Sequence, residues 1–215
     1  MIAYRRFVFA GLTIAFLAAF ARADEPAPAP APISVRQLAR SAHHDFVTQL
    51  TPYDDLHAAN GIQVFDRNSG VLVQTIDGIN GLEISLAPER FLKVDDANAD
   101  GHPDISVLVN NGGSGPNSAR YFYLFDPASG QFRFHEGLSE LSQPMVHRNG
   151  TVTSAGRSGG QHTASTYRFI RGKMVEIKRV DQTWSSDGKF AIVTTGTLRG
   201  GKMRFTSRRR LAVPG

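Results

Sequence analysis

Short runs of apolar residues, several of them with a period of two, fill most of the chain after Gly61. Turns rich in Gly, Asn, Asp and Ser separate these runs. This pattern predicts β-strands, each with one buried face. Asn149-Gly150 between two such runs is a strong hairpin signal, and the turns at Arg171-Gly172 and Arg199-Gly200-Gly201 predict two more. We therefore expect an all-β, antiparallel domain.

Four segments are harder to assign from their pattern. Residues 34–56 fit a helix about as well as two strands, and His43-His44 within them has the character of polar surface. Residues 156–163 are rich in small polar residues and indicate a flexible loop. Leu138 to Leu141 indicates a short turn. Arg208-Arg209-Arg210 indicates a solvated tail.

One phrase occurs twice, sixty residues apart. Phe65-Asp66 and Phe125-Asp126 each begin the pattern F-D-x-x-S-G. Asp and Ser suit turn chemistry and Gly accepts positive φ, so both copies predict a hairpin and not a catalytic aspartate. A period in this range is typical of propeller blades, although two copies do not establish a repeat protein.

The most informative stretch lies between two predicted strands, at residues 94–109. Its oxygen-bearing side chains fall at positions one, three, five and nine of a loop with Gly101 at position six. This is the front of a calcium loop of the D-x-[DN]-x-[DN]-G kind. Calcium takes six to eight oxygen ligands, and His102 at position seven would supply its backbone carbonyl. The predicted metal ligands are Asp96, Asn98, Asp100, His102 and Asp104.

The loop differs from an EF-hand at its C-terminal end. Position twelve is Val107 instead of a bidentate Glu, and Ile105, Val107 and Val109 predict a buried strand. We therefore expect a strand-loop-strand site with one structural Ca²⁺ as the cofactor. The alternative is an ordinary Asp/Asn/Gly turn that binds no metal.

The N-terminal segment has the features of an export signal. Residues 1–23 combine Arg5 and Arg6, an apolar run and a small-x-small cleavage site at Ala21-Arg22-Ala23. The alternative is a retained anchor. Residues 24–32 alternate Pro and Ala and predict a stiff linker. The β domain is expected over residues 33–215, and the protein in the periplasm, with no membrane span in its mature form.

Composition narrows the class of function. The chain has no Cys, which excludes disulfides, thiol nucleophiles and a lipidated N-terminal Cys. Residues 24–146 carry a net charge of −9, whereas residues 147–215 carry +11 and form a basic C-terminal segment. Because the protein is expected to be exported, we do not expect nucleic acid as its partner.

The calcium motif and the strand after it resemble a known family. The run from Val94 to Asp104, a Gly/Ser/Asn loop and then Tyr121-Phe122-Tyr123-Leu124-Phe125-Asp126-Pro127-Ala128-Ser129-Gly130 carry the resemblance, with Leu138 to Leu141 and Thr166 to Phe169 downstream. The chain resembles the calcium-binding periplasmic immunity proteins paired with peptidoglycan-hydrolase effectors of bacteria-killing type IV secretion systems, which are similar to i-type lysozyme inhibitors. The resemblance spans about residues 60–180.

The resemblance implies a β-propeller-like fold, an incomplete propeller, with one structural calcium. It also implies that the partner is a muramidase-type peptidoglycan hydrolase, inhibited by a loop that blocks its substrate cleft. The partner-binding candidates that it suggests are Ser114, Gly115, Asn117 and Tyr121. Two departures stand out: family members are often lipid-anchored through a Cys, which this chain lacks, and the basic segment after Asp181 has no counterpart.

Two other classes of function stay open. No G-x-S-x-G, H-E-x-x-H or phosphate-loop motif occurs, so we do not expect an enzyme, although several His residues could meet in space. The remaining alternative is an exported calcium-binding module that binds saccharides or surfaces.

Overall fold

The computed structural model describes residues 33–37, 41–87, 90–112 and 117–212. Within these ranges the chain forms fourteen β-strands and one single-turn helix. The predicted signal at residues 1–23 and the linker at 24–32 lie outside the described residues. No described helix is long and apolar enough to span a membrane.

The strands form three antiparallel sheets in which every strand pairs with its neighbour in sequence. The first sheet holds β1 (Ile33–Gln37), β2 (His44–Tyr53), β3 (Leu56–Asp66) and β4 (Leu72–Ile76). The second holds β5 (Leu92–Asp95), β6 (Asp104–Asn110), β7 (Ala119–Asp126) and β8 (Gln131–Phe134). The third holds β9 (Met145–His147), β10 (Thr151–Ser158), β11 (Gln161–Ile170), β12 (Lys173–Trp184), β13 (Phe190–Arg199) and β14 (Lys202–Ala212). The helix α1 (Glu136–Ser139) connects the second sheet to the third.

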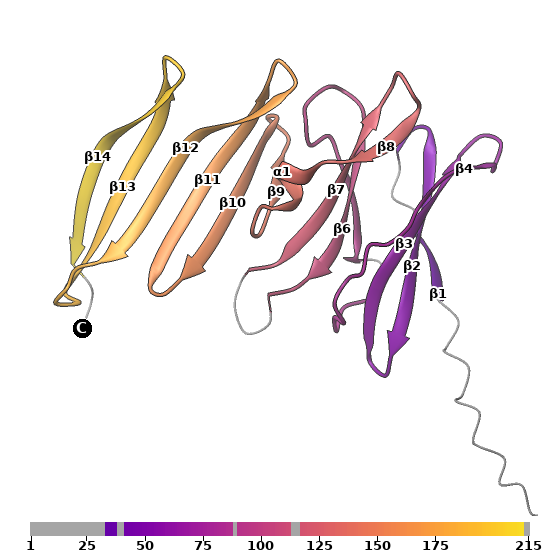
Figure 1. Cartoon of the computed structure of the whole chain (residues 1–215), viewed down its shortest axis with the longest axis horizontal. Helices are drawn as coiled ribbons and strands as arrows, with labels where there is room; N and C mark the ends of the chain where they lie inside the picture. Colours follow the sequence, from indigo (N-terminus) through magenta and orange to yellow (C-terminus); the bar gives the residue numbers. More distant parts are fainter. Residues whose placement is uncertain (1–32, 38–40, 88–89, 113–116, 213–215) are drawn as a thin grey trace, which may run out of the picture.

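Two apolar cores hold the sheets together, and Figure 1 shows the sheets side by side in chain order. The larger core lies between the first and second sheets and includes Phe46, Ile62, Phe91, Val107 and Phe132. The smaller core joins the second sheet to α1 and the near side of the third. It is formed by Ala97, Phe122, Leu138, Leu141 and Val152, with Tyr167, Phe169 and Met174 among the side chains packed against it. No described residue of β13 or β14 belongs to either core.

Both copies of the F-D-x-x-S-G phrase form the hairpins that the sequence predicts. Asp66 accepts hydrogen bonds from the backbone and hydroxyl of Ser69, both at 2.7 Å, in the turn between β3 and β4. Asp126 likewise accepts from Ala128 N–H and from the Ser129 hydroxyl between β7 and β8. The two aspartates therefore act in turns.

Several ambiguous segments adopt extended structure. Most of the described part of residues 34–56 is strand, and His44 is no simple surface residue, because its ring packs 5.4 Å from those of Phe125 and Phe132. The expected flexible loop at 156–163 is wrong: these residues end β10 and begin β11, joined by a tight turn. The expected tail is also wrong, since Arg208 to Arg210 are exposed but lie within β14, paired with β13. The segment from Leu138 to Leu141 falls partly in α1.

Candidate functional site

The acidic loop joins β5 to β6, as the sequence predicts. Asp96 Oδ1 accepts a hydrogen bond from Asp100 N–H at 3.1 Å, and Oδ2 accepts from Gly101 N–H at 3.0 Å. Asn98 Oδ1 also accepts from Asp100 N–H, at 3.0 Å. The chain reverses here because Ala99 and Gly101 adopt positive φ, 58° and 89°. Polar side chains thus hold the loop in a tight curl around its own backbone.

Asp100 and His102 occupy the exposed side of this curl. Asp100 Oδ1 accepts from His102 N–H at 2.8 Å, and Oδ2 accepts from the Asn98 side-chain amide at 2.7 Å. The His102 imidazole lies 5.7 Å from the Phe125 ring, centroid to centroid. That packing directs the imidazole toward Phe125, and the role of the His102 backbone carbonyl as a metal ligand stays a prediction.

Asp104 closes the loop at its buried base. Its Oδ2 accepts from Ala97 N–H and its Oδ1 from Phe125 N–H, both at 2.8 Å. Burial raises the pKa of Asp104 to about 7, because desolvation outweighs the backbone hydrogen bonds that favour the carboxylate. Asp104 therefore links the loop to β7, with a carboxyl group that binds a proton more readily than an exposed aspartate does.

The donor set of the loop suits a hard divalent cation. Three carboxylates and one side-chain amide come from nine consecutive residues, and the hydrogen bonds that they accept leave lone pairs free on each carboxylate. In the conformation observed, no three His, Asp or Glu side chains among the described residues are grouped as metal ligands. The residue types and the loop backbone fit calcium, and binding would require the carboxylates to converge.

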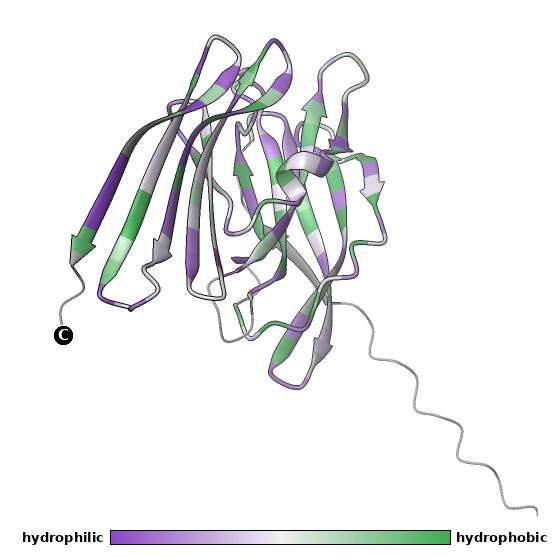
Figure 2. Cartoon of the chain, turned by 60° about the vertical axis from the view of Figure 1, so that its left-hand side comes forward, coloured by the Kyte–Doolittle hydropathy of each residue, from purple (hydrophilic) through white to green (hydrophobic). Residues whose placement is uncertain are grey.

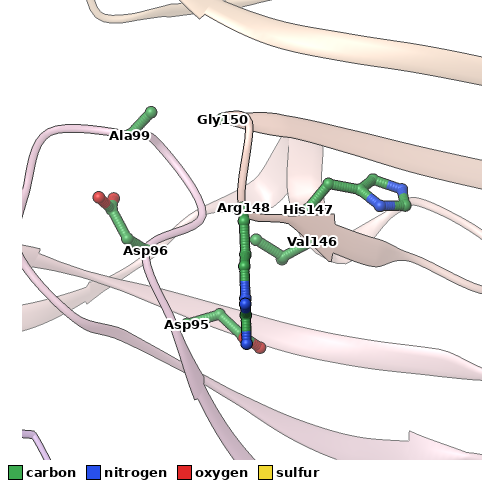
Figure 3. A pocket seen from close by; sticks show the side chains of 7 residues that line it. All are labelled: Asp95, Asp96, Ala99, Val146, His147, Arg148 and Gly150. Carbon is green, nitrogen blue, oxygen red and sulfur yellow. The ribbon is translucent and has the colours of Figure 1, made fainter.

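A cavity of about 250 Å³ lies beside the contact between the loop and the turn that joins β9 to β10 (Figure 3). Asp95, Asp96 and Ala99 line one side, and the turn containing Arg148 and Gly150 lines the other. Figure 3 shows the Arg148 side chain extending toward Asp95, whereas the His147 ring points away. A Cβ atom on Gly150 would lie 2.8 Å from the Ala99 Cβ, so the turn packs directly on the loop.

The predicted partner-binding residues are not all gathered at one place. Ser114 and Gly115 lie outside the described residues. Asn117 is exposed, and its side chain contacts the Arg157 carbonyl and the Ser142 hydroxyl, both at 3.4 Å. Tyr121 is half-buried on β7, with its ring edge-on to Phe134 at 5.5 Å and packed against the larger core. Tyr121 thus contributes to packing more than to an open surface.

Arg120, next to Tyr121, is a buried arginine that the sequence did not single out. Its Nη2 donates to the carbonyls of Phe91 and Ser106 at 2.7 and 2.8 Å, and its Nε donates to the Ser106 hydroxyl. Burial lowers the pKa of Arg120 to about 10, and the charge of Asp95 opposes this shift. The guanidinium fastens β7 to β6 and to the start of β5.

Asn117 lines a shallow hollow of about 330 Å³. The rest of its wall comes from Ser142 and from the tip of the β10–β11 hairpin, including Arg157, Gln161 and Thr163. Ser142 and Gln161 were missed in the sequence because nothing local marks them. Only the antiparallel pairing of β10 with β11 brings the tip of this hairpin to Asn117.

Comparison with known proteins gives one informative similarity. No protein-family model matches the chain, and no curated protein matches it. A solved structure described as a Xanthomonas type IV secretion system related protein superposes with a TM-score of 0.57 at 19% identity. The match covers 82% of this chain and 93% of the other. At this identity the similarity establishes a shared fold.

Proposed function

We propose that this protein is a periplasmic immunity protein that binds a lysozyme-like peptidoglycan hydrolase and occludes its active-site cleft, with no catalytic activity of its own. The observation that carries the proposal is the fold shared, over 82% of this chain, with a protein related to type IV secretion. The acidic loop and the Y-F-Y-L-F-D-P-A-S-G strand, which carry the family resemblance, are adjacent in the second sheet of that fold.

The hollow beside Asn117 supports contact with a protein better than turnover of a small substrate. It is shallow, and the side chains around it are mainly amides and hydroxyls, with Arg157 as the one charged group among the described residues that line it. Hydrolases of the lysozyme class carry paired carboxylates in their clefts. An exposed arginine flanked by hydrogen-bonding side chains is suited to meet such carboxylates.

Calcium is part of this proposal. Asp96, Asn98, Asp100 and Asp104 would hold the ion with the His102 carbonyl, and the ion would screen the repulsion among the three carboxylates. Its contribution would be structural, since Asp104 bonds to β7 and Ala99 packs on Gly150. The three successive meanders would then correspond to the blades of an incomplete, propeller-like assembly.

The test is digestion of peptidoglycan by a muramidase in the presence of the purified mature protein. We expect inhibition at stoichiometric concentration. Asn117→Ala and Arg157→Ala should each weaken inhibition by about tenfold or more. The matched control is Arg171→Ala, which removes an arginine from an exposed turn between β11 and β12 and should leave inhibition unchanged.

Two results would contradict the proposal. One is undiminished digestion by every muramidase tested at an excess of the protein. The other is release of soluble peptidoglycan fragments by the protein alone, which would make it an enzyme.

A further inference from the structure

The third sheet has an inner face and an outer face that its strand register defines. Tyr167, Phe169 and Met174 point inward, toward α1 and the second sheet, since a Cβ on Gly137 would lie 3.1 Å from the Met174 Cε and His135 stacks edge-on to Phe169. Directly paired residues of antiparallel strands share a face, and faces alternate along each strand. The register therefore assigns each paired strand residue to one face, on both sides of the register shifts at Ile177 and Thr206.

Acidic and basic side chains are sorted between these faces. The strands of the third sheet contain two acidic residues, Glu176 and Asp181, and both are on the inner face. There Glu176 accepts from the Ser165 hydroxyl at 2.5 Å, and Asp181 pairs with Arg179 at 3.0 Å. The outer face carries eight basic residues and no acidic one. These are Arg157, Arg168, Lys173, Lys178, Arg199, Lys202, Arg204 and Arg209.

A row of aligned residues crosses five strands of the outer face. Arg157 pairs with His162, His162 with Gln182, Gln182 with Val193, and Val193 with Arg209. Four strand spacings of about 4.8 Å give the row a length of about 19 Å. Beside it, small side chains at Ala155, Ala164 and Val180 form the floor of a hollow of about 270 Å³. The row is thus a long track with a recess along one side.

Trp184 stands at the edge of this track and is the sole tryptophan of the chain. It is on the same face as Gln182, two residues away, and 44% of it is exposed. Its ring covers the β10–β11 turn, where a Cβ on Gly160 would lie 3.2 Å from the indole Cδ1. The glycine lets the indole lie close against the turn while much of the ring stays open to solvent. An exposed aromatic ring beside amide, imidazole and guanidinium groups offers both stacking and hydrogen bonds.

We propose that the outer face of the third sheet binds a linear glycan that carries carboxylate groups. Arg157 and Arg209 at the two ends of the row pair with carboxylates, Gln182 and His162 bond to hydroxyls, and Trp184 stacks on a sugar ring. The eight positive charges with no acidic neighbour select an anionic chain. A narrow row with a recess along one side fits a linear polymer better than a flat lipid surface. Ile170, Trp184 and Leu211 are also exposed on this basic face, so the vesicle measurement below distinguishes a glycan from an anionic lipid surface. Phe205, which is also strongly exposed, is on the inner face, where its ring covers Gly196.

Figure 2 shows the same strands from a second side, with β14 hydrophilic over most of its length beside an apolar stretch of β13. This strand supplies a matched pair of variants. Arg204 and Arg209 are on the outer face, whereas Arg208 and Arg210 are on the inner face of the same strand. Replacing either pair by glutamine changes the net charge equally.

The experiment titrates the mature protein with polygalacturonate, a soluble glycan with a carboxylate on each ring, and follows Trp184 fluorescence. Binding should change the emission, and dextran, a neutral glycan, should not. Arg204→Gln/Arg209→Gln should weaken binding by about tenfold or more, and Arg208→Gln/Arg210→Gln by about twofold or less. In co-sedimentation with insoluble peptidoglycan, Trp184→Ala should lose binding, whereas Phe205→Ala, which removes an exposed aromatic ring from the inner face, should retain it. Thermal melting of each variant checks that it is folded.

Three outcomes would overturn the inference. Equal losses from the two arginine pairs would mean that only net charge matters. Binding without any change in Trp184 emission would place the ligand elsewhere. If the protein bound phosphatidylglycerol vesicles but neither polygalacturonate nor peptidoglycan, the ligand would be an anionic lipid surface instead. None of these outcomes bears on inhibition of a hydrolase, which the proposed function assigns to the hollow beside Asn117.

Discussion

The side-chain amide of Gln74 exchanges two hydrogen bonds with the backbone of Phe132. Its Nε2 donates to the Phe132 carbonyl and its Oε1 accepts from the Phe132 N–H, each at 2.8 Å. Gln74 is on β4 and Phe132 on β8, so one side chain supplies the bonds that a neighbouring strand would otherwise make. This pair joins the first sheet to the second at their edges, above the core that they share.

Gln74→Ala should destabilise the protein by about 1–3 kcal/mol, because it leaves the N–H and carbonyl of a buried residue without partners. Urea unfolding measures the loss. Gln131→Ala, one residue before Phe132 but exposed, is the control and should cost less than about 0.5 kcal/mol. Equal losses for the two variants would show that the paired hydrogen bonds add no stability.

Gly150→Ala tests the contact between the acidic loop and the third sheet. Gly150 has a φ of 74°, and its new Cβ would lie 2.8 Å from the Ala99 Cβ. Gly70 has a similar φ of 69° but no neighbour within 4 Å, so Gly70→Ala isolates the backbone penalty of about 1 kcal/mol. Gly150→Ala should lower the free energy of unfolding by about 1–3 kcal/mol more than Gly70→Ala does, as measured by urea unfolding. Equal losses of stability for Gly150→Ala and Gly70→Ala would mean that the turn moves away from Ala99 at no cost in free energy.

His135 should make stability depend on pH. Its Nδ1 accepts a hydrogen bond from Leu138 N–H at the start of α1, at 3.1 Å, and burial lowers its pKa. The folded state therefore binds fewer protons than the unfolded state just below about pH 6.5, and stability should fall as pH decreases through that range. His135→Asn, which keeps a capping acceptor, should make the pH dependence shallower. It should not abolish it, because burial also lowers the pKa of His44.

The measurement is the melting temperature between pH 5 and 8. His162→Asn, on the outer face of the third sheet, serves as the control for removal of one histidine. If the melting temperature of His135→Asn depended more steeply on pH than that of the parent protein, His135 would not be a source of the pH dependence.

Removing calcium should lower the melting temperature, since an ion that binds only the folded state stabilises it by mass action, by about 2.7 kcal/mol at a hundredfold excess over Kd. Asp100→Ala should abolish the difference between calcium and EGTA. Asp126→Ala removes an aspartate from a turn outside the loop and should preserve that difference. A melting temperature that is unaffected by EGTA in the parent protein would remove calcium from the proposal.

Local signals were enough to predict the second sheet. The period-two runs around Ile105 and Tyr123 are strands, and the repeated F-D-x-x-S-G phrases are turns, because each of these features depends on residues close together in sequence. Chain order also predicted that the acidic loop would lie between two strands. That it binds calcium stays a prediction.

The third sheet was harder to predict from the sequence than the second. The pattern of residues 156–163 predicts a loop because its small polar side chains show no apolar face, yet these residues pair with one another across the β10–β11 turn, and β12 pairs with the β11 side. Arg208 to Arg210 were mistaken for a tail because three consecutive charges have no period, and pairing with β13 makes them a strand. The hollow at Asn117 depends on contacts 25 and 40 residues away in sequence, which no local pattern encodes.

Because each strand hydrogen-bonds to the strands beside it in sequence, no sheet has to wait for a distant segment before it can form. Loop-closure entropy is therefore small within every sheet, which favours rapid folding. A polypeptide that emerges N-terminus first, from a ribosome or a translocation channel, could complete one meander before the next is released. The first meander would remain with its apolar side uncovered until the second arrives, making that interval the one in which an assisting chaperone would matter most.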